Sequence, residues 1–224
     1  MNLSPDGGRG VYLNKGRPKG VFVIGLTGGL GSGKSTVAEM LRELGAEILN
    51  ADQIGHQVYA PGGPAYRDII DAFGTQVLAA DGTVDRRRLA SIVFQDPQAL
   101  QRLNAITHPR IREAIRQRLQ ELAARGVEVA VLEAALLLEA GWDDLVDEVW
   151  VTVCPPEVAA RRAAQRSGIS MEEALARVRA QMPVEERARR AQVIIHTDTD
   201  LEDTRRQVER EWARLKARLS TGGR

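Results

Sequence analysis

The glycine-rich segment that ends in Lys34 and Ser35 is the part of the sequence best suited to bind a polyphosphate. It begins at Gly28 and fits the pattern G-x-x-x-x-G-K-[ST]. Glycines allow backbone N–H groups to approach phosphate oxygens closely, and a helix that starts near Lys34 points the positive end of its dipole at the same anion. We expect the phosphates of ATP to be held by Gly28, Gly29, Gly31, Ser32, Gly33, Lys34, Ser35 and Thr36.

Two side chains of this segment have tasks of their own. Lys34 is long enough to reach the β- and γ-phosphates, and the hydroxyl of Ser35 is a ligand for Mg²⁺. Glu133, which ends a later apolar segment, is expected to support the same ion through water; the alternative is an acid on a solvent-exposed loop. The cofactors that these residues predict are ATP and Mg²⁺.

The segments around the glycines predict the elements that position them. Apolar and β-branched residues at 21–26 indicate a buried strand, helical periodicity follows at 35–44, and 47–50 indicates a second strand. A strand, a helix and a strand in about thirty residues form a βαβ unit, so the sheet is expected to be parallel. The other predicted strands are 127–132, 146–153 and 192–196.

Helical periodicity fills the intervals between these strands. The helices begin where capping residues stand, with Asp85 and Asp96 as predicted N-caps. The predicted fold class is α/β: a parallel five-stranded sheet sandwiched by helices, with two helical insertions. The predicted helices after the first are 53–59, 85–94, 97–125, 157–167, 170–182, 183–191 and 200–219.

The same reading divides the chain into parts. Residues 1–20 are expected to be a flexible leader, and 21–224 a single domain. The parts of that domain are a core of 21–54, 127–154 and 192–219, an acceptor-binding helical insertion at 55–126, and a helical lid at 155–191.

The composition excludes several classes of protein. With 43% apolar and 27% charged residues, the chain of 224 residues has the material for a core and is not disordered. Its one cysteine, Cys154, excludes a disulfide scaffold, and no apolar run is long enough to span a bilayer. A net charge of +1 gives no overall attraction for nucleic acid. We expect a cytoplasmic protein without nucleic-acid or membrane partners, as a monomer or a small homo-oligomer.

The fate of the γ-phosphate separates the remaining classes of nucleotide-binding protein. A GTPase switch needs an N-K-x-D motif, and a translocating ATPase usually has a D-E pair after an apolar strand; this sequence has neither. A small kinase needs an acceptor-binding insertion and an arginine-bearing lid, for which the two insertions are suitably placed. A non-catalytic regulator is the alternative, and Lys34, Ser35 and Asp52 together with the lid arginines argue against it.

Several segments resemble the dephospho-coenzyme A kinase family, across roughly residues 21–215. The most family-specific of them is the Asn-Ala-x-x-His-Pro segment that begins at Asn104. The sequence departs from the family pattern at Asn50, Ala135, Gln192 and Thr197, and the departure at Thr197 lies near the expected adenine site. The segments that carry the resemblance are VIGLTGGLGSGKSTV at 23–37, Ala51-Asp52, Pro61-Gly62-Gly63, 81–89, 103–109, 136–139, and the lid residues Arg162, Arg166 and Gln181.

The resemblance implies a P-loop nucleoside-kinase-like fold and a reaction. ATP would phosphorylate the ribose 3′-hydroxyl of dephospho-coenzyme A, the last step of coenzyme A synthesis. A nucleoside-monophosphate or shikimate-type kinase is the alternative, and the segment at Asn104 argues against it. Asp52 follows the second strand, at the sheet edge where ligands bind, so it is expected to orient the hydroxyl and take its proton. Its other candidate role, compatible with the first, is N-cap of the helix 53–59.

The lid supplies the expected arginines. Arg162 and Arg166 are four residues apart on the predicted helix 157–167, so they share a face and can point at one phosphate chain. Arg161 lies about 100° round that helix and is expected to contribute less. The alternative for all of them is an exposed helix face.

The insertion is expected to hold the acceptor. Residues 85–125 carry nine arginines and four acids, an excess of charge that suits a pyrophosphate-bearing substrate. Arg110 and His108 are the candidate substrate contacts. The alternatives are an exposed helix face for the arginines and a structural role for His108. For Glu139, a structural role is favoured.

Overall fold

The computed structural model describes residues 20–222, so the predicted leader lies almost entirely outside the described residues. Its centre is a five-stranded sheet in which every paired strand is parallel, as predicted. The middle strand is β1, between β3 and β4, so the loop that leaves its carboxyl end opens at the centre of the sheet edge. In sheet order, the strands are β2 (Glu47–Asn50), β3 (Val129–Glu133), β1 (Phe22–Gly28), β4 (Glu148–Val153) and β5 (Val193–His196).

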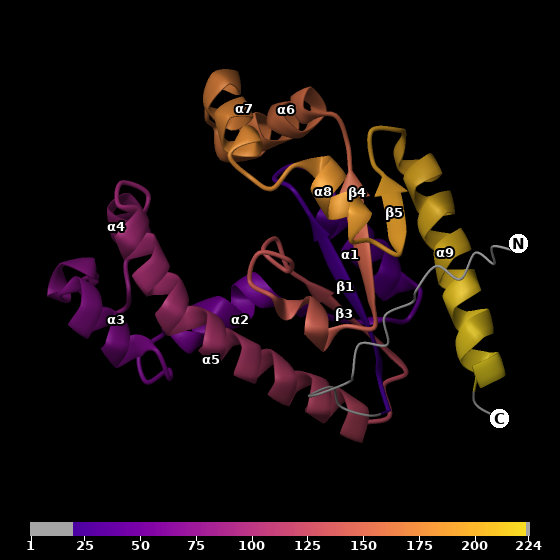
Figure 1. Cartoon of the computed structure of the whole chain (residues 1–224), viewed down its shortest axis with the longest axis horizontal. Coiled ribbons are helices and arrows are strands. Elements are labelled where there is room, and N and C mark those ends of the chain that lie inside the picture. Colours follow the sequence, from indigo (N-terminus) through magenta and orange to yellow (C-terminus); the bar gives the residue numbers. More distant parts are fainter. Residues whose placement is uncertain (1–19, 223–224) are drawn as a thin grey trace, which may run out of the picture.

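Helices cover both faces of this sheet, and two apolar cores result (Figure 1). On one face, α1 (Lys34–Glu43) and α9 (Leu201–Gly222) pack together and against the strands. On the other face lie α2 (Ala51–Val58) and the long α5 (Pro97–Ala124). Alternate residues of β3 enter the two cores: Val129 and Val131 one, Ala130 and Leu132 the other. This explains the continuous apolar run, because both faces of the strand are buried.

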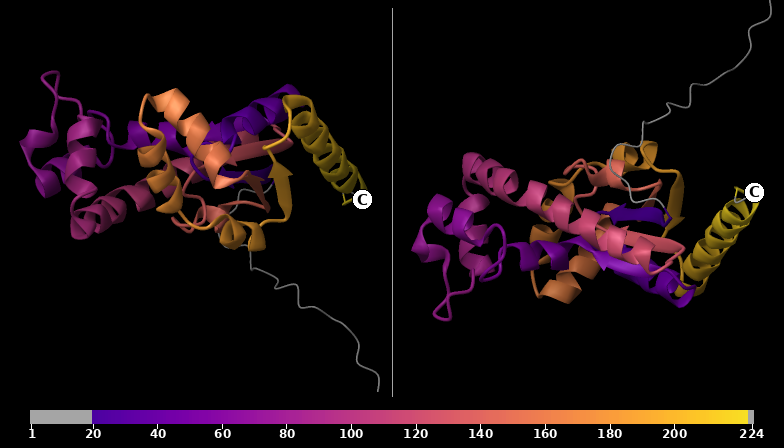
Figure 2. Two further views of the ribbon diagram at one scale, coloured as in Figure 1. Left: turned by 90° about the horizontal axis from the view of Figure 1, so that it is seen from above. Right: turned by 90° about the horizontal axis from the view of Figure 1, so that it is seen from below.

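The larger insertion is a group of helices at one end of the molecule. Asp85 and Asp96 are the N-caps of two of them, as predicted, and each side chain accepts a backbone N–H. One helix there was not predicted from the sequence, α3, which is only eight residues long. The elements between α2 and α5 are α3 (Tyr66–Phe73), the 3-10 turn η1 (Thr75–Val77) and α4 (Arg86–Val93). The two views of Figure 2 place this group and α9 at opposite ends of the molecule.

The smaller insertion stands over the carboxyl edge of the sheet (Figure 1). Its helices are α6 (Pro156–Ser167), α7 (Met171–Arg179) and α8 (Val184–Arg189), close to the predicted bounds. Small residues let α6 and α7 approach closely: Ala160, Ala163 and Ala174 form a buried cluster of their own. A further 3-10 turn, η2 (Trp142–Leu145), precedes β4. Among residues 20–222, no helix is long and apolar enough to cross a membrane.

Candidate active site

A cavity of about 350 Å³ opens at the carboxyl edge of the sheet, beneath α6. Residues from four separate parts of the chain meet there: the glycine-rich loop, the end of β2, the end of β3 and the lid. Six side chains singled out in the sequence line it together, namely Lys34, Ser35, Asp52, Glu133, Arg162 and Arg166. Three further lining residues have polar or small side chains that the sequence did not assign to a catalytic role: Asn50, Ala135 and Gln181.

The glycine-rich loop is shaped to receive an anion. Gly33 caps α1 in the left-handed conformation (φ 82°) without any side-chain hydrogen bond, so the first N–H groups of the helix remain available. Gly31 is also left-handed, and a Cβ on it would lie 2.1 Å from the carbonyl oxygen of Ala159 in α6. The Ser32 side chain hydrogen-bonds to the Thr152 hydroxyl at 2.7 Å, and Ser32 also lines the cavity.

The ammonium group of Lys34 is available to bind an anion. Its Nζ donates to the carbonyl oxygen of Gly28 at 3.3 Å, and no carboxylate among residues 20–222 lies within ion-pair distance of it. Burial lowers the pKa of Lys34 below its ordinary value, while the carboxylates of Glu133 and Asp52 act in the opposite direction. An arriving polyphosphate would satisfy this ammonium group and favour its charged form.

Glu133 and Ser35 form a pair of hard oxygen ligands. The Ser35 hydroxyl donates to Glu133 Oε1 at 2.9 Å, and Asn50 Nδ2 donates to Glu133 Oε2 at 2.9 Å. Glu133 is the last residue of β3 and only 8% exposed, so the alternative of an acid on an exposed loop is wrong. A hydroxyl and a carboxylate beside a phosphate site fit Mg²⁺, which retains waters and takes few protein ligands.

Asp52 lies in the first turn of α2, where its carboxylate is exposed to the cavity. The alternative role, N-cap of this helix, is wrong, because the helix begins earlier, at Ala51. The N-cap is Asn50, whose Oδ1 accepts the backbone N–H of Gln53 at 3.0 Å. In the described part of the chain, the Asp52 carboxylate has no hydrogen-bond partner.

The two lid arginines reach the cavity from one face of α6, as their spacing predicts. Arg162 donates to the carbonyl oxygen of Thr197 at 2.6 Å and approaches its hydroxyl at 3.3 Å. Arg166 is exposed and, within residues 20–222, has no carboxylate partner. Arg161 is exposed as well but does not line the cavity.

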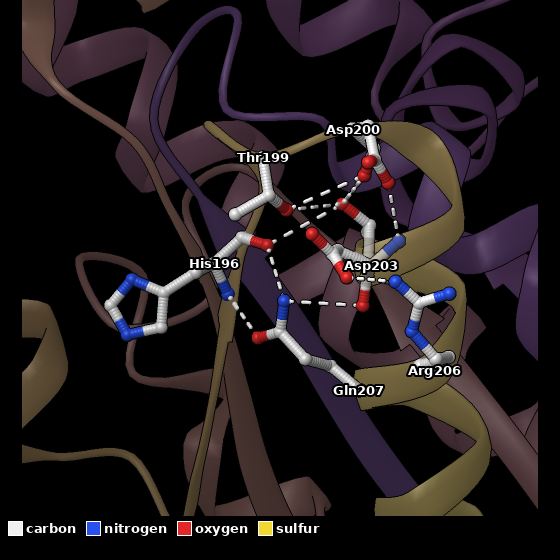
Figure 3. A network of polar contacts seen from close by, with 7 residues as sticks. His196, Thr199, Asp200, Asp203, Arg206 and Gln207 are labelled. Atoms are coloured by element: carbon white, nitrogen blue, oxygen red, sulfur yellow. Dashed lines mark hydrogen bonds and ion pairs between the residues drawn. The ribbon is translucent and has the colours of Figure 1, made fainter.

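A second, smaller cavity of about 230 Å³ adjoins the first, between α1, α6 and the β5–α9 turn. Thr197, Thr199 and Leu201 line it, together with Arg162. Figure 3 shows how side chains fix this turn. The Gln207 side chain accepts from the backbone N–H of His196 and donates to its carbonyl oxygen, each at 2.9 Å. These hydrogen bonds tie the end of β5 to α9, on either side of the turn that lines the cavity.

His108 and Arg110 lie outside both cavities. The half-buried His108 ring meets Trp142 edge-on, with ring centres 5.6 Å apart, and burial lowers the pKa of His108. Arg110 donates to the carbonyl oxygen of Pro64 at 2.9 Å and pairs with Asp68 on α3. The Arg110–Asp68 pair links α5 to α3 within the insertion, whereas His108 packs against η2 outside it. The sequence could not reveal the first contact because it did not predict α3.

Most arginines of the insertion are neutralised in the same way. Arg112 pairs with Asp144 and Arg125 with Glu47, so acids outside the counted segment offset its charge. Among the described residues, Arg86, Arg87 and Arg102 of that segment have no carboxylate partner, and Arg86 contacts His56 instead, with Nη1 2.8 Å from Nε2. His56 lies one helical turn after Asp52, so Arg86 reaches the helix that carries the catalytic candidate. The remaining pairs are Arg88–Asp85, Arg110–Asp68, Arg116–Glu113 and Arg118–Glu121.

Two lid residues touch the glycine-rich loop. Gln181 accepts the backbone N–H of Leu30 at 2.7 Å. The family resemblance singled out Gln181 but did not indicate its partner. Arg187 of α8 is 2% exposed and pairs with Glu139 at 2.8 Å, in agreement with a structural role for Glu139. Nothing in the sequence distinguishes Arg187 from the arginines that surround it.

Comparisons with known proteins agree with this geometry. Residues 22–203 match the family described as "Dephospho-CoA kinase". The dephospho-CoA kinase of Geobacter sulfurreducens is 50% identical over 192 residues, which are 86% of this chain and 98% of that protein. A crystal structure of a Thermus thermophilus protein is 38% identical with a TM-score of 0.75, and the match covers 88% of this chain and 99% of that one.

A solved dephospho-CoA kinase from Campylobacter jejuni is 29% identical, with a TM-score of 0.66 over 86% of this chain and 96% of its own. The family match spans most of the described residues, and the Geobacter relative is covered almost from end to end. This chain therefore belongs to the dephospho-CoA kinase family.

Proposed function

We propose that this protein transfers the γ-phosphoryl group of ATP to the ribose 3′-hydroxyl of dephospho-coenzyme A, which gives coenzyme A and ADP. The observation that carries the proposal is the position of Asp52. Its unpartnered carboxylate shares a cavity with Lys34 and Ser35 of the phosphate loop, in a member of this family. A hydroxyl acceptor needs such a carboxylate within hydrogen-bond reach of its proton.

Each residue of the cavity has a separate task in this reaction. Phosphoryl transfer needs little covalent work from the protein, so positioning and charge stabilisation dominate. Lys34 and the N–H groups of the loop bind the phosphates, and Asp52 orients the 3′-hydroxyl and takes its proton as the bond to phosphorus forms. Arg162 and Arg166 stabilise charge on the transferred group when the lid closes and excludes water.

The cofactor and the adenine base fit the remaining groups. Bound Mg²⁺ offsets charge on the phosphate oxygens; the residues that would hold it are Ser35 directly and Glu133 through water. The second cavity, with Thr197 and Thr199, is the place for the adenine of ATP. A kinase acting on these metabolites works in the cytoplasm, as a monomer or small homo-oligomer. Arg110 supports the acceptor site through its pair with Asp68 in the insertion, and His108 through its contact with Trp142.

Arg86 is the insertion residue that we assign to the acceptor. It is the arginine of the counted segment that contacts α2, at His56, one turn from Asp52. Burial and the nearby Arg86 charge lower the pKa of His56, so the ring is neutral at physiological pH and leaves the guanidinium available for an anion. The pyrophosphate of dephospho-coenzyme A is such an anion.

The acceptor identity is tested by ATP consumption in a coupled assay. The purified protein is given ATP and Mg²⁺ with dephospho-coenzyme A, with nucleoside monophosphates, or with shikimate. We expect turnover with dephospho-coenzyme A alone and its loss in Asp52→Asn. Asp71→Asn is the matched control, since Asp71 is an exposed carboxylate on α3 outside the cavity. Faster turnover with shikimate or a nucleoside monophosphate would overturn the proposal.

A further inference from the structure

Arg187 is an unusual residue to find buried. It is the one buried residue of the short helix α8, and its side chain is 2% exposed. Nη2 donates to Glu139 Oε1 at 2.8 Å, whereas Nε is buried without a hydrogen-bond partner among residues 20–222. Glu139 is partly exposed, so Arg187 is the buried member of this ion pair. A buried cation with an unsatisfied donor adds little stability compared with an apolar side chain of similar size. Its charge therefore calls for an explanation other than stability.

The position of the guanidinium gives that explanation. Arg187 Nη1 lies 3.3 Å from the place that a Cβ on Gly29 would occupy, so it packs directly against the phosphate loop. Its charge also acts on Lys34, whose pKa it helps to lower after the larger effect of burial. The ion pair with Glu139 balances this charge, which makes a buried cation tolerable beside a second cation.

Gln181 makes a parallel contact from the same part of the lid. Its Oε1 accepts the backbone N–H of Leu30 at 2.7 Å and lies 3.2 Å from the same Cβ position on Gly29. Gln181 follows α7 and Arg187 belongs to α8, so residues 181–187, the return segment of the lid, hold two adjacent residues of the loop.

These contacts account for the glycine at position 29. The pattern G-x-x-x-x-G-K-[ST] leaves that position open, and Gly29 is not among the described glycines with positive φ. What disfavours a larger residue is close approach: a methyl group there would be tight against two side chains that hydrogen bonds hold in place, and both would have to shift slightly. The loop and the return segment are therefore complementary in shape.

We propose that Arg187, together with Gln181, is a positioning residue that sets the first half of the phosphate loop through Gly29 and Leu30. The return segment thereby couples the state of the lid to the shape of the phosphate site. The proposal rests on the proposed function only in that the loop binds ATP, and it makes no assumption about the acceptor.

The test compares Arg187→Met with the same substitution at a control position, Arg190→Met. Arg190 follows α8 and pairs with Asp143 after β3, as Arg187 pairs with Glu139, but away from the loop. We expect Arg187→Met to weaken ATP binding, measured by calorimetry without acceptor, by about tenfold. Arg187→Lys, which keeps the charge, is expected to recover part of the loss. Arg190→Met is expected to bind ATP as the unaltered protein does.

A double-mutant cycle tests the route through Gly29. Gly29→Ala alone is expected to weaken ATP binding by about tenfold. In the Arg187→Met background, the same substitution is expected to weaken ATP binding distinctly less, because the flexible methionine side chain can move away from the new methyl group. Thermal unfolding without nucleotide serves as the fold control, and Gly29→Ala remains informative if Arg187→Met fails to fold.

Two results would overturn the proposal. One is an Arg187→Met protein of lowered thermal midpoint whose ATP affinity is unchanged, since that describes a merely structural residue. The other is an additive cycle between positions 29 and 187. If ATP binding follows the expected pattern while dephospho-coenzyme A is not phosphorylated, the positioning role stands and the proposed acceptor is wrong.

Discussion

Positively charged side chains lack carboxylate partners at the sheet edge, within the described residues, but are mostly paired with acids in the helical insertion. At the edge, Lys34 and Arg166 face a cavity without a carboxylate partner among the described residues. In the insertion, arginines such as Arg112 and Arg110 are paired with acids, some from distant parts of the chain. The comparison teaches that the number of arginines in a segment does not locate an anion site; what locates one is charge that the fold leaves uncompensated.

The largest expected effect comes from the most isolated cation. Lys34→Ala should lower kcat/KM by at least about a hundredfold, because it deletes a charge contact with the transferred phosphate. The fold should persist, since Lys34 Nζ makes one long contact, to Gly28. Steady-state kinetics measures the loss of activity, and thermal unfolding checks that the fold persists. Near-normal turnover in the variant would show that the uncompensated charge is not used.

Asp52→Asn should come next, with kcat falling by up to about a hundredfold and the KM for ATP changing little. The amide keeps the size of the side chain but cannot take the proton of the acceptor. Because Asn50 caps α2, the thermal midpoint should be almost unaffected. A large loss of thermal stability with normal kcat would place the residue in the fold rather than in the reaction.

The lid offers a paired test within one helix. Arg166→Lys keeps the charge and loses the planar fork, so kcat/KM should fall by about tenfold. Arg161→Lys is the control, since Arg161 is equally exposed but does not line the cavity. Similar small effects in both kinetic measurements would refute the assignment of α6 as the arginine-bearing face of the lid.

The smallest effects are expected in the insertion, where they sharpen the comparison. Arg86→Gln should raise the KM for dephospho-coenzyme A several-fold, by about 1 kcal/mol of binding, and leave the KM for ATP unchanged. Arg112→Gln, which breaks a partly exposed pair with Asp144, should change the free energy of unfolding by less than about 1 kcal/mol and leave both KM values unaltered. Equal effects on the acceptor KM would contradict the distinction between paired and unpaired arginines.

The phosphate site was predictable because its chemistry is local. The pattern from Gly28 to Ser35 is read within one loop, and the strand and helix that flank it follow from apolar periodicity. Asp52 and Glu133 were also within reach, since each follows or ends a parallel strand and such ends share one sheet edge. The caps Asp85 and Asp96 were visible for the same reason, as local signals.

What could not be predicted depends on contacts between distant segments. The ion pair of Arg110, a candidate substrate contact, could not be predicted because its partner Asp68 lies on a helix that the sequence did not predict. Asp52 was a candidate N-cap of α2, but Asn50, two residues earlier, takes that role. Only backbone geometry decides between the two residues. The burial of Arg187 follows from its packing against Gly29 and Glu139, which no spacing in the sequence records.

The position of the new phosphate tests the central claim most directly. The protein, ATP, Mg²⁺ and dephospho-coenzyme A are incubated together, ADP is quantified, and the product is examined by phosphorus NMR. The account predicts one ADP for each new phosphomonoester, located on the ribose 3′-oxygen, and formation slowed by up to about a hundredfold with Asp52→Asn. ADP released without a new monoester, or a monoester at another position, would contradict it.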